Sequence, residues 1–215
     1  MLNKNKTKIL QILKDEYPQA KTALHYVNPI QILVATILSA QCTDAQVNRV
    51  TKELFKKYKT VKSYAEADLK IFEQEIRSTG FYKNKTKNVI ATAQKIMEDF
   101  YGKVPQSMED LLKLPGVARK TANIVLFNAF NKSEGIAVDT HVKRLSGRLG
   151  LSENNVPEKI ERDLMNLVDS KEWGKVTNWL IEHGRKVCMA RKPKCNECVV
   201  NKLCPSFKEF VGKKK

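Results

Sequence analysis

Residues Leu114–Val125 read LPGVARKTANIV, a Pro–Gly turn that leads directly into an apolar, helix-forming segment. Pro115 fixes its own φ and Gly116 can adopt a positive φ, so the chain can reverse sharply between two helices. The second helix then begins with backbone N–H groups that have no partner within the helix, and such groups bind a phosphate without reading sequence. The segment is typical of a helix–hairpin–helix, and it also fits an ordinary helix connection.

Arg119 and Lys120 stand in the first turn of this second helix. The positive end of the helix dipole and the neighbouring Arg119 both disfavour a positive charge on Lys120. Schiff-base chemistry needs a neutral amine, so Lys120 is a candidate nucleophile. On physical grounds alone, a lysine that binds a phosphate is the simpler interpretation.

The chain carries 39 Lys and Arg against 23 Asp and Glu, a formal net charge of +16. Such an excess of positive charge destabilises the folded state through repulsion within the chain, and it is typical of proteins that bind a polyanionic partner. No strongly amphipathic segment accompanies the charge, so the balance favours nucleic acid over a membrane surface. The basic residues recur in clusters at Arg49–Lys62, Lys83–Lys87, Lys113–Lys120, Lys143–Arg148 and Arg185–Lys194.

Neither a signal peptide nor a membrane span is predicted. No apolar run follows the opening MLNKNKTK, and the longest apolar stretch, Ile30–Ala40, is too short and too interrupted by polar residues to span a bilayer. We therefore expect a cytoplasmic protein.

Hydrophobic periodicity is helical nearly throughout, and no convincing alternating strand or repeat is present. The fold is therefore predicted to be all-α, with a domain boundary near Gly135. Helices are expected at the N-terminus before Pro18, from Pro29 to about residue 40 with Asn28 as N-cap, and near 44–58, 67–77, 84–101, 107–113, 118–130, 140–149, 157–169 and 172–184.

Four of the five cysteines lie close together with the spacing C-x6-C-x2-C-x5-C, at Cys188, Cys195, Cys198 and Cys204. Without a signal peptide, disulfides are a poor explanation, whereas four thiolates in one short loop can converge on a metal centre. Zinc modules usually pair two C-x2-C knuckles, and only one is present here, so the spacing favours iron–sulfur and leaves zinc open. Cys42 stands apart and is expected to be buried.

Three cations, Arg191, Lys192 and Lys194, lie between the first two cysteines of this cluster. A metal-held loop that presents three positive charges is suited to binding phosphates.

Asp139, in AVDTHVKRLSGRLGL, follows an apolar approach and precedes a helical run, which predicts an N-cap. No capping box supports it, because the residue three positions later is Val142. A carboxylate in a cleft can also stabilise a developing cation or activate a nucleophile. His141 and His183 are expected to be structural, with no indication of a His-based triad.

In this combination and order, the motifs resemble those of the endonuclease III family of DNA glycosylases. The cysteine tail is the most specific element, because its spacing is that of the family's 4Fe–4S cluster. The resemblance therefore implies one 4Fe–4S cluster, and not zinc, as the cofactor. It runs over nearly the whole chain, through LSAQCTD (38–44), GFYKNK (80–85), LPGVARKTA (114–122), VDTHVKR (138–144), HGR (183–185) and the four-cysteine tail.

The family's fold implies two all-α domains with DNA bound in the cleft between them. Residues 22–134 would form a six-helix domain that contains the helix–hairpin–helix. Residues 1–21 and 135–215 would form a discontinuous iron–sulfur domain.

The resemblance implies a bifunctional DNA glycosylase/AP lyase of base excision repair. Lys120 matches the family's catalytic lysine, which displaces an oxidised pyrimidine and forms a Schiff base, and Asp139 matches its catalytic aspartate. β-Elimination then cuts the strand 3′ to the abasic site. The expected partner is double-stranded DNA with damaged pyrimidines or abasic sites. The protein is expected to be a monomer that binds DNA at the nucleoid and does not bind membranes.

The resemblance also implies DNA contacts. Gln41 matches the residue that fills the gap left by the extruded base, and the loop with Phe81 and Tyr82 would wedge into the opposite strand. Family members commonly carry Gly at position 118 and often Leu at position 81, differences that bear on affinity more than on chemistry. The remaining expected contacts are Leu114, Gly116, Ala118, Arg119, Thr121, His141, Arg144, Arg191, Lys192 and Lys194.

Two other functions stay open. An adenine-mismatch glycosylase of the same superfamily would share the cluster and the aspartate, but typically lacks the lysine. A non-catalytic, metal-stabilised DNA-binding module would use Lys120 to bind phosphate and Asp139 only to cap a helix.

Overall fold

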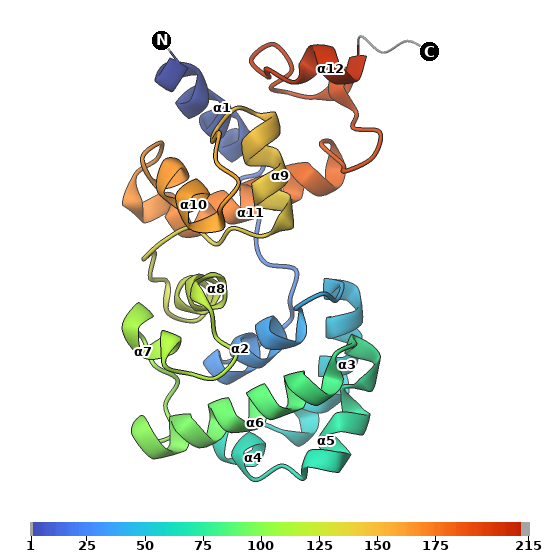
Figure 1. The fold of residues 1–215 in the computed structure, drawn as a ribbon, viewed down its shortest axis with the longest axis vertical. Coiled ribbons are helices and arrows are strands. Elements are labelled where there is room, and N and C mark those ends of the chain that lie inside the picture. Colours follow the sequence, from blue (N-terminus) through green and yellow to red (C-terminus); the bar gives the residue numbers. More distant parts are fainter. Residues whose placement is uncertain (1, 212–215) are drawn as a thin grey trace. The chain divides into compact units, whose positions relative to one another are not determined.

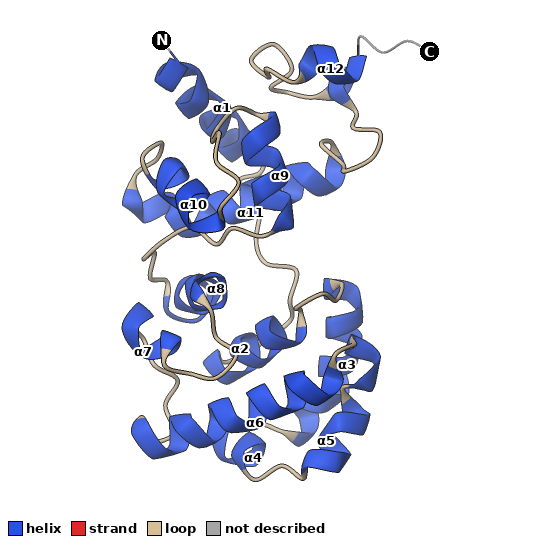
Figure 2. Cartoon of the chain, in the orientation of Figure 1, coloured by secondary structure: helices blue, strands red, loops and turns tan. Residues whose placement is uncertain are grey.

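The computed structural model describes residues 2–211 of the 215-residue chain. Within this range the secondary structure is helical and contains no strand, which confirms the predicted all-α class (Figure 2). The chain divides into two compact units. One is Thr22–Lys132, and the other joins the described residues of Met1–Lys21 and Ser133–Lys215.

The unit Thr22–Lys132 is organised around α2, whose residues Ile30–Leu38 are all buried. Helices α3, α6 and α8 pack against α2, and α4 packs along the long helix α6 (Figure 1). Its elements are α2 (Pro29–Leu38), α3 (Asp44–Lys57), α4 (Val61–Ala65), α5 (Leu69–Glu75), the 3₁₀ turn η1 (Arg77–Thr79), α6 (Tyr82–Asp99), α7 (Met108–Leu112) and α8 (Arg119–Phe130).

The other unit is built around α11, which packs against α1 and α9. Gly184 permits the close approach of α9, because a Cβ at this position would lie 3.0 Å from the Arg144 guanidinium and 3.2 Å from the His141 ring. The helices of this unit are α1 (Leu2–Glu16), α9 (Thr140–Arg148), α10 (Pro157–Met165), α11 (Trp173–Lys186) and α12 (Phe207–Val211).

Local sequence signals place most of these helices. Asn28 caps α2 as expected, its side chain accepting a hydrogen bond from the Gln31 amide at 3.1 Å, with Pro29 in the first turn. Helix α4 was not predicted, since five residues are too few for a helical period to register. The short helix α12 was not predicted either.

Two smaller expectations were wrong. Helix α2 ends at Leu38, two residues early, because the chain then turns into Gln41 at φ 52°. Cys42 is only half-buried against the core. The helices described here include none long and apolar enough to cross a membrane.

Candidate functional site

The predicted helix–hairpin–helix is present as α7, a tight turn and α8, which pack against each other. Leu114 and Val117 are buried and anchor the turn in the core. The Thr92 hydroxyl on α6 donates a hydrogen bond to the Pro115 carbonyl. The turn is therefore held by a hydrogen bond from α6 as well as by its own two helices.

Two features of the turn require glycine at position 116. Its φ of +73° lies in the left-handed region, and a Cβ there would lie 2.7 Å from the Asn88 side chain. Backbone at this position is exposed, and the helix that follows begins three residues later. The turn thus presents bare backbone beside the first turn of α8.

Ala118 is the N-cap residue of α8, with φ −93° and ψ 170°. This is extended backbone that alanine adopts without strain, so the substitution for glycine has no conformational cost. Ala118 is exposed, whereas Ala122, Val125 and Leu126 are buried and anchor α8 in the core.

Alanine offers no side-chain oxygen to the first-turn N–H groups of α8. By contrast, the side chains of Asn28, Thr43, Thr60, Asp68 and Ser107 cap α2, α3, α4, α5 and α7. At the N-terminus of α8, therefore, no N-cap side chain competes with an anion for the backbone donors.

Ala118→Ser is expected to raise the free energy of unfolding while weakening DNA binding. A serine Oγ would cap α8 and add about 1 kcal/mol of stability, but it would compete with a phosphate for the same N–H groups. Thermal unfolding and titration of an undamaged duplex measure the two effects. Ala118→Gly is the control, since it adds no acceptor. Tighter DNA binding by the serine variant would contradict the phosphate role of this helix end.

Lys120 lies in the first turn of α8 and lines a pocket of about 360 Å³. The pocket is bounded by the end of α2, the start of α6 and the hairpin, all within one unit. It brings together six residues predicted from the sequence, namely Gln41, Phe81, Gly116, Ala118, Lys120 and Thr121.

Gln41 and Phe81 are both exposed and both have positive φ, 52° and 50°. Left-handed backbone is uncommon for non-glycine residues and clusters at functional sites. Phe81, 63% exposed, is a large apolar side chain held in solvent at the N-cap of α6. Tyr82 differs from it, because its ring packs against the core.

Asp139 lies in the other unit and caps α9, as its sequence context predicts. Its Oδ1 accepts a hydrogen bond from the Val142 amide at 2.7 Å. This bond fixes the carboxylate at the start of a helix whose first residues are Thr140 and His141.

Arg144, one helical turn further along α9, makes its hydrogen bonds with other residues of the protein. Its Nη2 lies 3.3 Å from the Gly184 carbonyl, 3.2 Å from the Cys188 carbonyl and 3.3 Å from the His141 ring. Burial lowers the pKa of its guanidinium. Arg144 therefore holds the end of α11 against α9, and its contact with DNA stays a prediction, as does that of His141.

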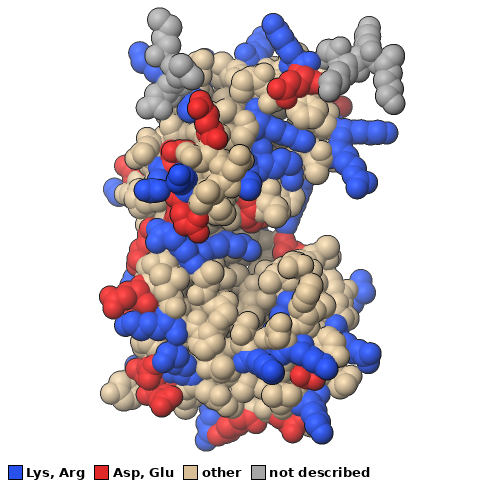
Figure 3. Space-filling view, viewed as in Figure 1, with Lys and Arg blue, Asp and Glu red and all other residues tan. Residues whose placement is uncertain are grey.

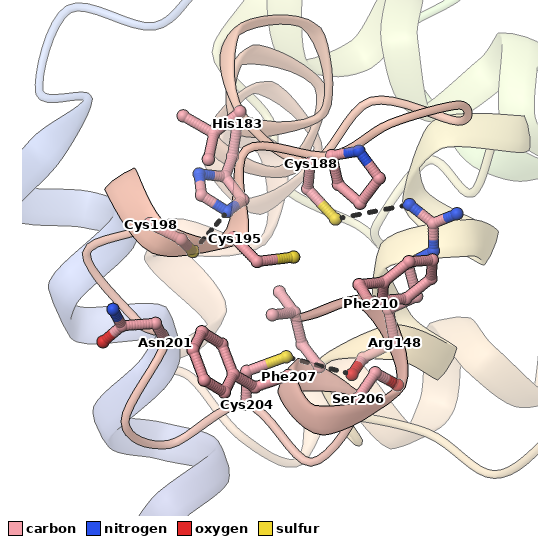
Figure 4. Close-up of a pocket in the computed structure, with 13 residues that line it drawn as sticks. Arg148, His183, Cys188, Cys195, Cys198, Asn201, Cys204, Ser206, Phe207 and Phe210 are labelled. Atoms are coloured by element: carbon pink, nitrogen blue, oxygen red, sulfur yellow. Dashed lines mark hydrogen bonds between the residues drawn. The ribbon is translucent and has the colours of Figure 1, made fainter. Parts of the chain in front are cut away.

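The four clustered cysteines line one pocket in this unit (Figure 4). The sulfur atoms of Cys188, Cys195 and Cys204 point toward a common space, and that of Cys198 lies beside the His183 ring. All four thiols are free. Among residues 2–211, no three His, Cys, Asp or Glu side chains lie close enough together to hold one single metal ion.

Arg148, at the end of α9, joins this pocket to the loop between the first two cysteines. Its Nη1 lies 3.7 Å from the Cys188 Sγ and 2.7 Å from the Met189 carbonyl, and its Nη2 lies 3.0 Å from the Ala190 carbonyl. The guanidinium also stacks over the Phe210 ring, 4.5 Å from its centroid. The helix that Asp139 caps thus ends against the cysteine loop.

His183 is fully buried between Tyr17 and Cys198. The Tyr17 hydroxyl lies 3.0 Å from its Nδ1, and the Cys198 Sγ lies 3.5 Å from its Nε2. Burial lowers the pKa of His183 to about 4, so the ring is neutral at pH 7. This burial agrees with the structural role expected of His183. Tyr17, the residue that follows α1, thus contacts a side chain that lines the cysteine pocket.

Arg191, Lys192 and Lys194 are exposed between Cys188 and Cys195. Figure 3 shows Lys and Arg side chains gathered over the loop that follows α11. Lys192 has a φ of 51°, so this loop is tightly turned.

Comparison with known proteins assigns the family. The model of the HhH-GPD superfamily base excision DNA repair proteins matches residues 34–170, and that of the iron–sulfur binding domain of endonuclease III matches residues 188–204. Endonuclease III of Synechocystis sp. is 55% identical, over 93% of this chain and 91% of its own length. Endonuclease III of Bacillus subtilis is 46% identical, over 91% of this chain and 89% of its own length. The chain belongs to the endonuclease III family.

Solved structures of the family have the same fold. A non-covalent endonuclease III–DNA complex matches with a TM-score of 0.94 at 40% identity, covering 98% of this chain and 99% of that one. A trapped endonuclease III–DNA covalent intermediate matches with a TM-score of 0.90 at 41% identity, covering 95% and 97%.

Family membership confirms a 4Fe–4S cluster over zinc as the cofactor. The pocket fits it chemically, because four free thiols surround an otherwise largely apolar lining that includes Val187, Phe207 and Phe210. Burial raises the pKa of Cys198 to about 11 and also raises that of Cys204. Cluster ligands are thiolates, so these protons leave when iron binds.

Cys198→Ala is expected to abolish the brown colour and the broad absorbance near ~400 nm of an iron–sulfur protein. It should also destabilise the unit that contains the cysteines, because metal-binding free energy is folding free energy. Iron analysis and thermal unfolding measure both. Cys42→Ala, in the other unit, is the matched control and should keep its iron. Full iron content in the Cys198 variant would exclude this thiol as a ligand.

Proposed function

We infer that the protein is a bifunctional DNA glycosylase/AP lyase of base excision repair, acting on double-stranded DNA that carries oxidised pyrimidines or abasic sites. Family membership supports the glycosylase activity. The observation that carries the lyase is Lys120, which lies at the uncapped start of α8 and lines one pocket with Gln41 and Phe81.

Phosphate binding by the hairpin brings the reacting sugar to Lys120. The exposed backbone at Gly116 and the first-turn N–H groups of α8, which the N-cap side chain does not occupy, bind the DNA backbone without reading sequence. Arg191, Lys192 and Lys194 add positive charge from the cysteine loop. Binding of this kind is strongest at low salt.

The reaction begins with attack of the neutral Lys120 Nζ on C1′ of the extruded nucleotide. The bond between C1′ and the base breaks, and the base leaves with the electron pair and takes up a proton. The sugar ring opens to an imine between C1′ and Nζ, which acidifies the C2′ proton. Loss of that proton breaks the C3′–O bond, and the strand is cut 3′ to the abasic site.

Asp139 would stabilise the positive charge that develops on the sugar or accept the proton of Lys120. Gln41 and Phe81 act on the DNA side, one filling the space of the extruded base and the other wedging into the opposite strand. Extrusion costs roughly a few kcal/mol, less at a lesion.

Cys188, Cys195, Cys198 and Cys204 are the ligands in this proposal, and the cluster supplies a rigid support for the basic loop. Arg148 extends that support to α9 through the Met189 and Ala190 carbonyls. The protein works as a monomer in the cytoplasm, at the nucleoid.

Borohydride reduction during reaction with a duplex that carries one oxidised pyrimidine tests the proposal. A covalent protein–DNA adduct is expected, because borohydride reduces the imine to a stable amine. Base release without an adduct would indicate a mismatch-type monofunctional glycosylase. DNA binding with neither activity would indicate a non-catalytic binding module.

A further inference from the structure

Lys85 is a buried lysine that the proposed mechanism does not use. Its side chain projects from the first turn of α6 and is only 4% exposed. Burial lowers its pKa. A lysine is rarely buried unless its charge is compensated, so its partners need an explanation.

The Lys85 Nζ donates two hydrogen bonds, each 2.8 Å long, to the backbone carbonyls of Leu38 and Thr79. Leu38 is the last residue of α2, where carbonyls lack partners within the helix and the dipole favours a cation. The last turn of α2 contains no basic residue of its own. Lys85 supplies that cation from another helix.

The second acceptor, the Thr79 carbonyl, ends η1. The two carbonyls therefore stand just before the two strained positions of the site. Gln41 follows Leu38 by three residues, and Phe81 follows Thr79 by two; both have positive φ and both line the pocket with Lys120. One ammonium thus joins the two segments that carry these residues.

We propose that Lys85 is a positioning residue for nucleotide extrusion, which holds the segments of Gln41 and Phe81 at a fixed separation so that both enter the duplex together. This inference rests on the DNA-contacting roles given to Gln41 and Phe81 in the proposed function. Left-handed backbone at two exposed positions persists only when the surroundings fix it. The buried ammonium fixes both through the carbonyls that precede them.

Lys85→Met tests the proposal, since methionine keeps an unbranched apolar side chain and loses both hydrogen bonds. The probe is a duplex with a stable tetrahydrofuran abasic analogue opposite 2-aminopurine, whose fluorescence rises when the base unstacks. No bond is broken in this assay, so it is independent of Lys120. Lys95→Met is the matched control, because it removes a lysine from the same helix that only pairs with Asp99 on the surface.

We expect the fluorescence gain of Lys85→Met to fall about tenfold, while affinity for undamaged duplex stays within about twofold of the Lys95→Met control. In a protein that already carries Gln41→Ala and Phe81→Ala, Lys85→Met should cause no further loss, because residues that act through each other are not additive. Thermal unfolding shows that each variant is folded.

An unchanged fluorescence gain in folded Lys85→Met would overturn the proposal. A further fall of the fluorescence gain when Lys85→Met is added to the Gln41→Ala, Phe81→Ala protein would also overturn it. So would an equal loss of affinity for damaged and undamaged duplex, because either result indicates a general structural role of Lys85. Strand cleavage of an oxidised-pyrimidine duplex by the wild-type protein is measured in parallel. Its failure would refute the proposed enzymatic function and leave the fluorescence test of Lys85 valid.

Discussion

Lys120→Ala is expected to give no borohydride adduct and to cut an abasic duplex at least about 10³-fold more slowly than the wild-type protein. The loss is large because the amine is the nucleophile, and no other group of the described pocket can form an imine except the buried Lys85, whose Nζ is held by two carbonyls. Gel analysis of trapped and cleaved products measures both effects.

DNA affinity separates this role from phosphate binding. The nucleophile can be lost with little change in binding, because Gly116 and the first-turn N–H groups of α8 remain. Lys113→Ala is the matched control, since it removes an exposed lysine from the same hairpin, where it pairs with Glu109 and Asp110. If Lys120→Ala keeps its adduct, or if it loses activity only in proportion to affinity, Lys120 holds a phosphate and is not the nucleophile.

The sequence predicts those features whose cause is local. A positive-φ glycine in a Pro–Gly turn, an Asn–Pro helix start and an Asp before a helical run all depend on residues within one or two turns of each other. Gly116, Asn28 and Asp139 therefore adopt the expected conformations. The cysteine spacing is equally local, and it was sufficient to predict a metal site.

Features whose cause lies far along the chain could not be predicted in this way. Tyr17 and His183 are separated by 166 residues, Arg148 and Cys188 by 40, and Lys85 and Leu38 by 47. Each of these contacts depends on how helices pack, which hydrophobic periodicity does not specify. Lys85 and Arg148 lay within basic clusters, and only burial and hydrogen bonds distinguish them from surface charges.

Asp139→Asn is expected to slow base release by about 10²–10⁴-fold while leaving the fold nearly intact. Asparagine caps a helix as well as aspartate does, so its Oδ1 can keep the bond to the Val142 amide. Loss of the negative charge at the helix start lowers the free energy of unfolding by at most about 1 kcal/mol. Single-turnover base release and thermal unfolding measure the two quantities.

Asp139→Ala removes both the carboxylate and the cap, and comparing it with Asp139→Asn separates capping from catalysis. If Asp139 only caps α9, the asparagine variant stays active and the alanine variant loses about 1 kcal/mol of stability. If the carboxylate is catalytic, both lose base release. Strand cleavage at a pre-formed abasic site then identifies its role. A carboxylate that activates Lys120 is needed there too, whereas one that stabilises the cationic sugar is needed only while the base departs.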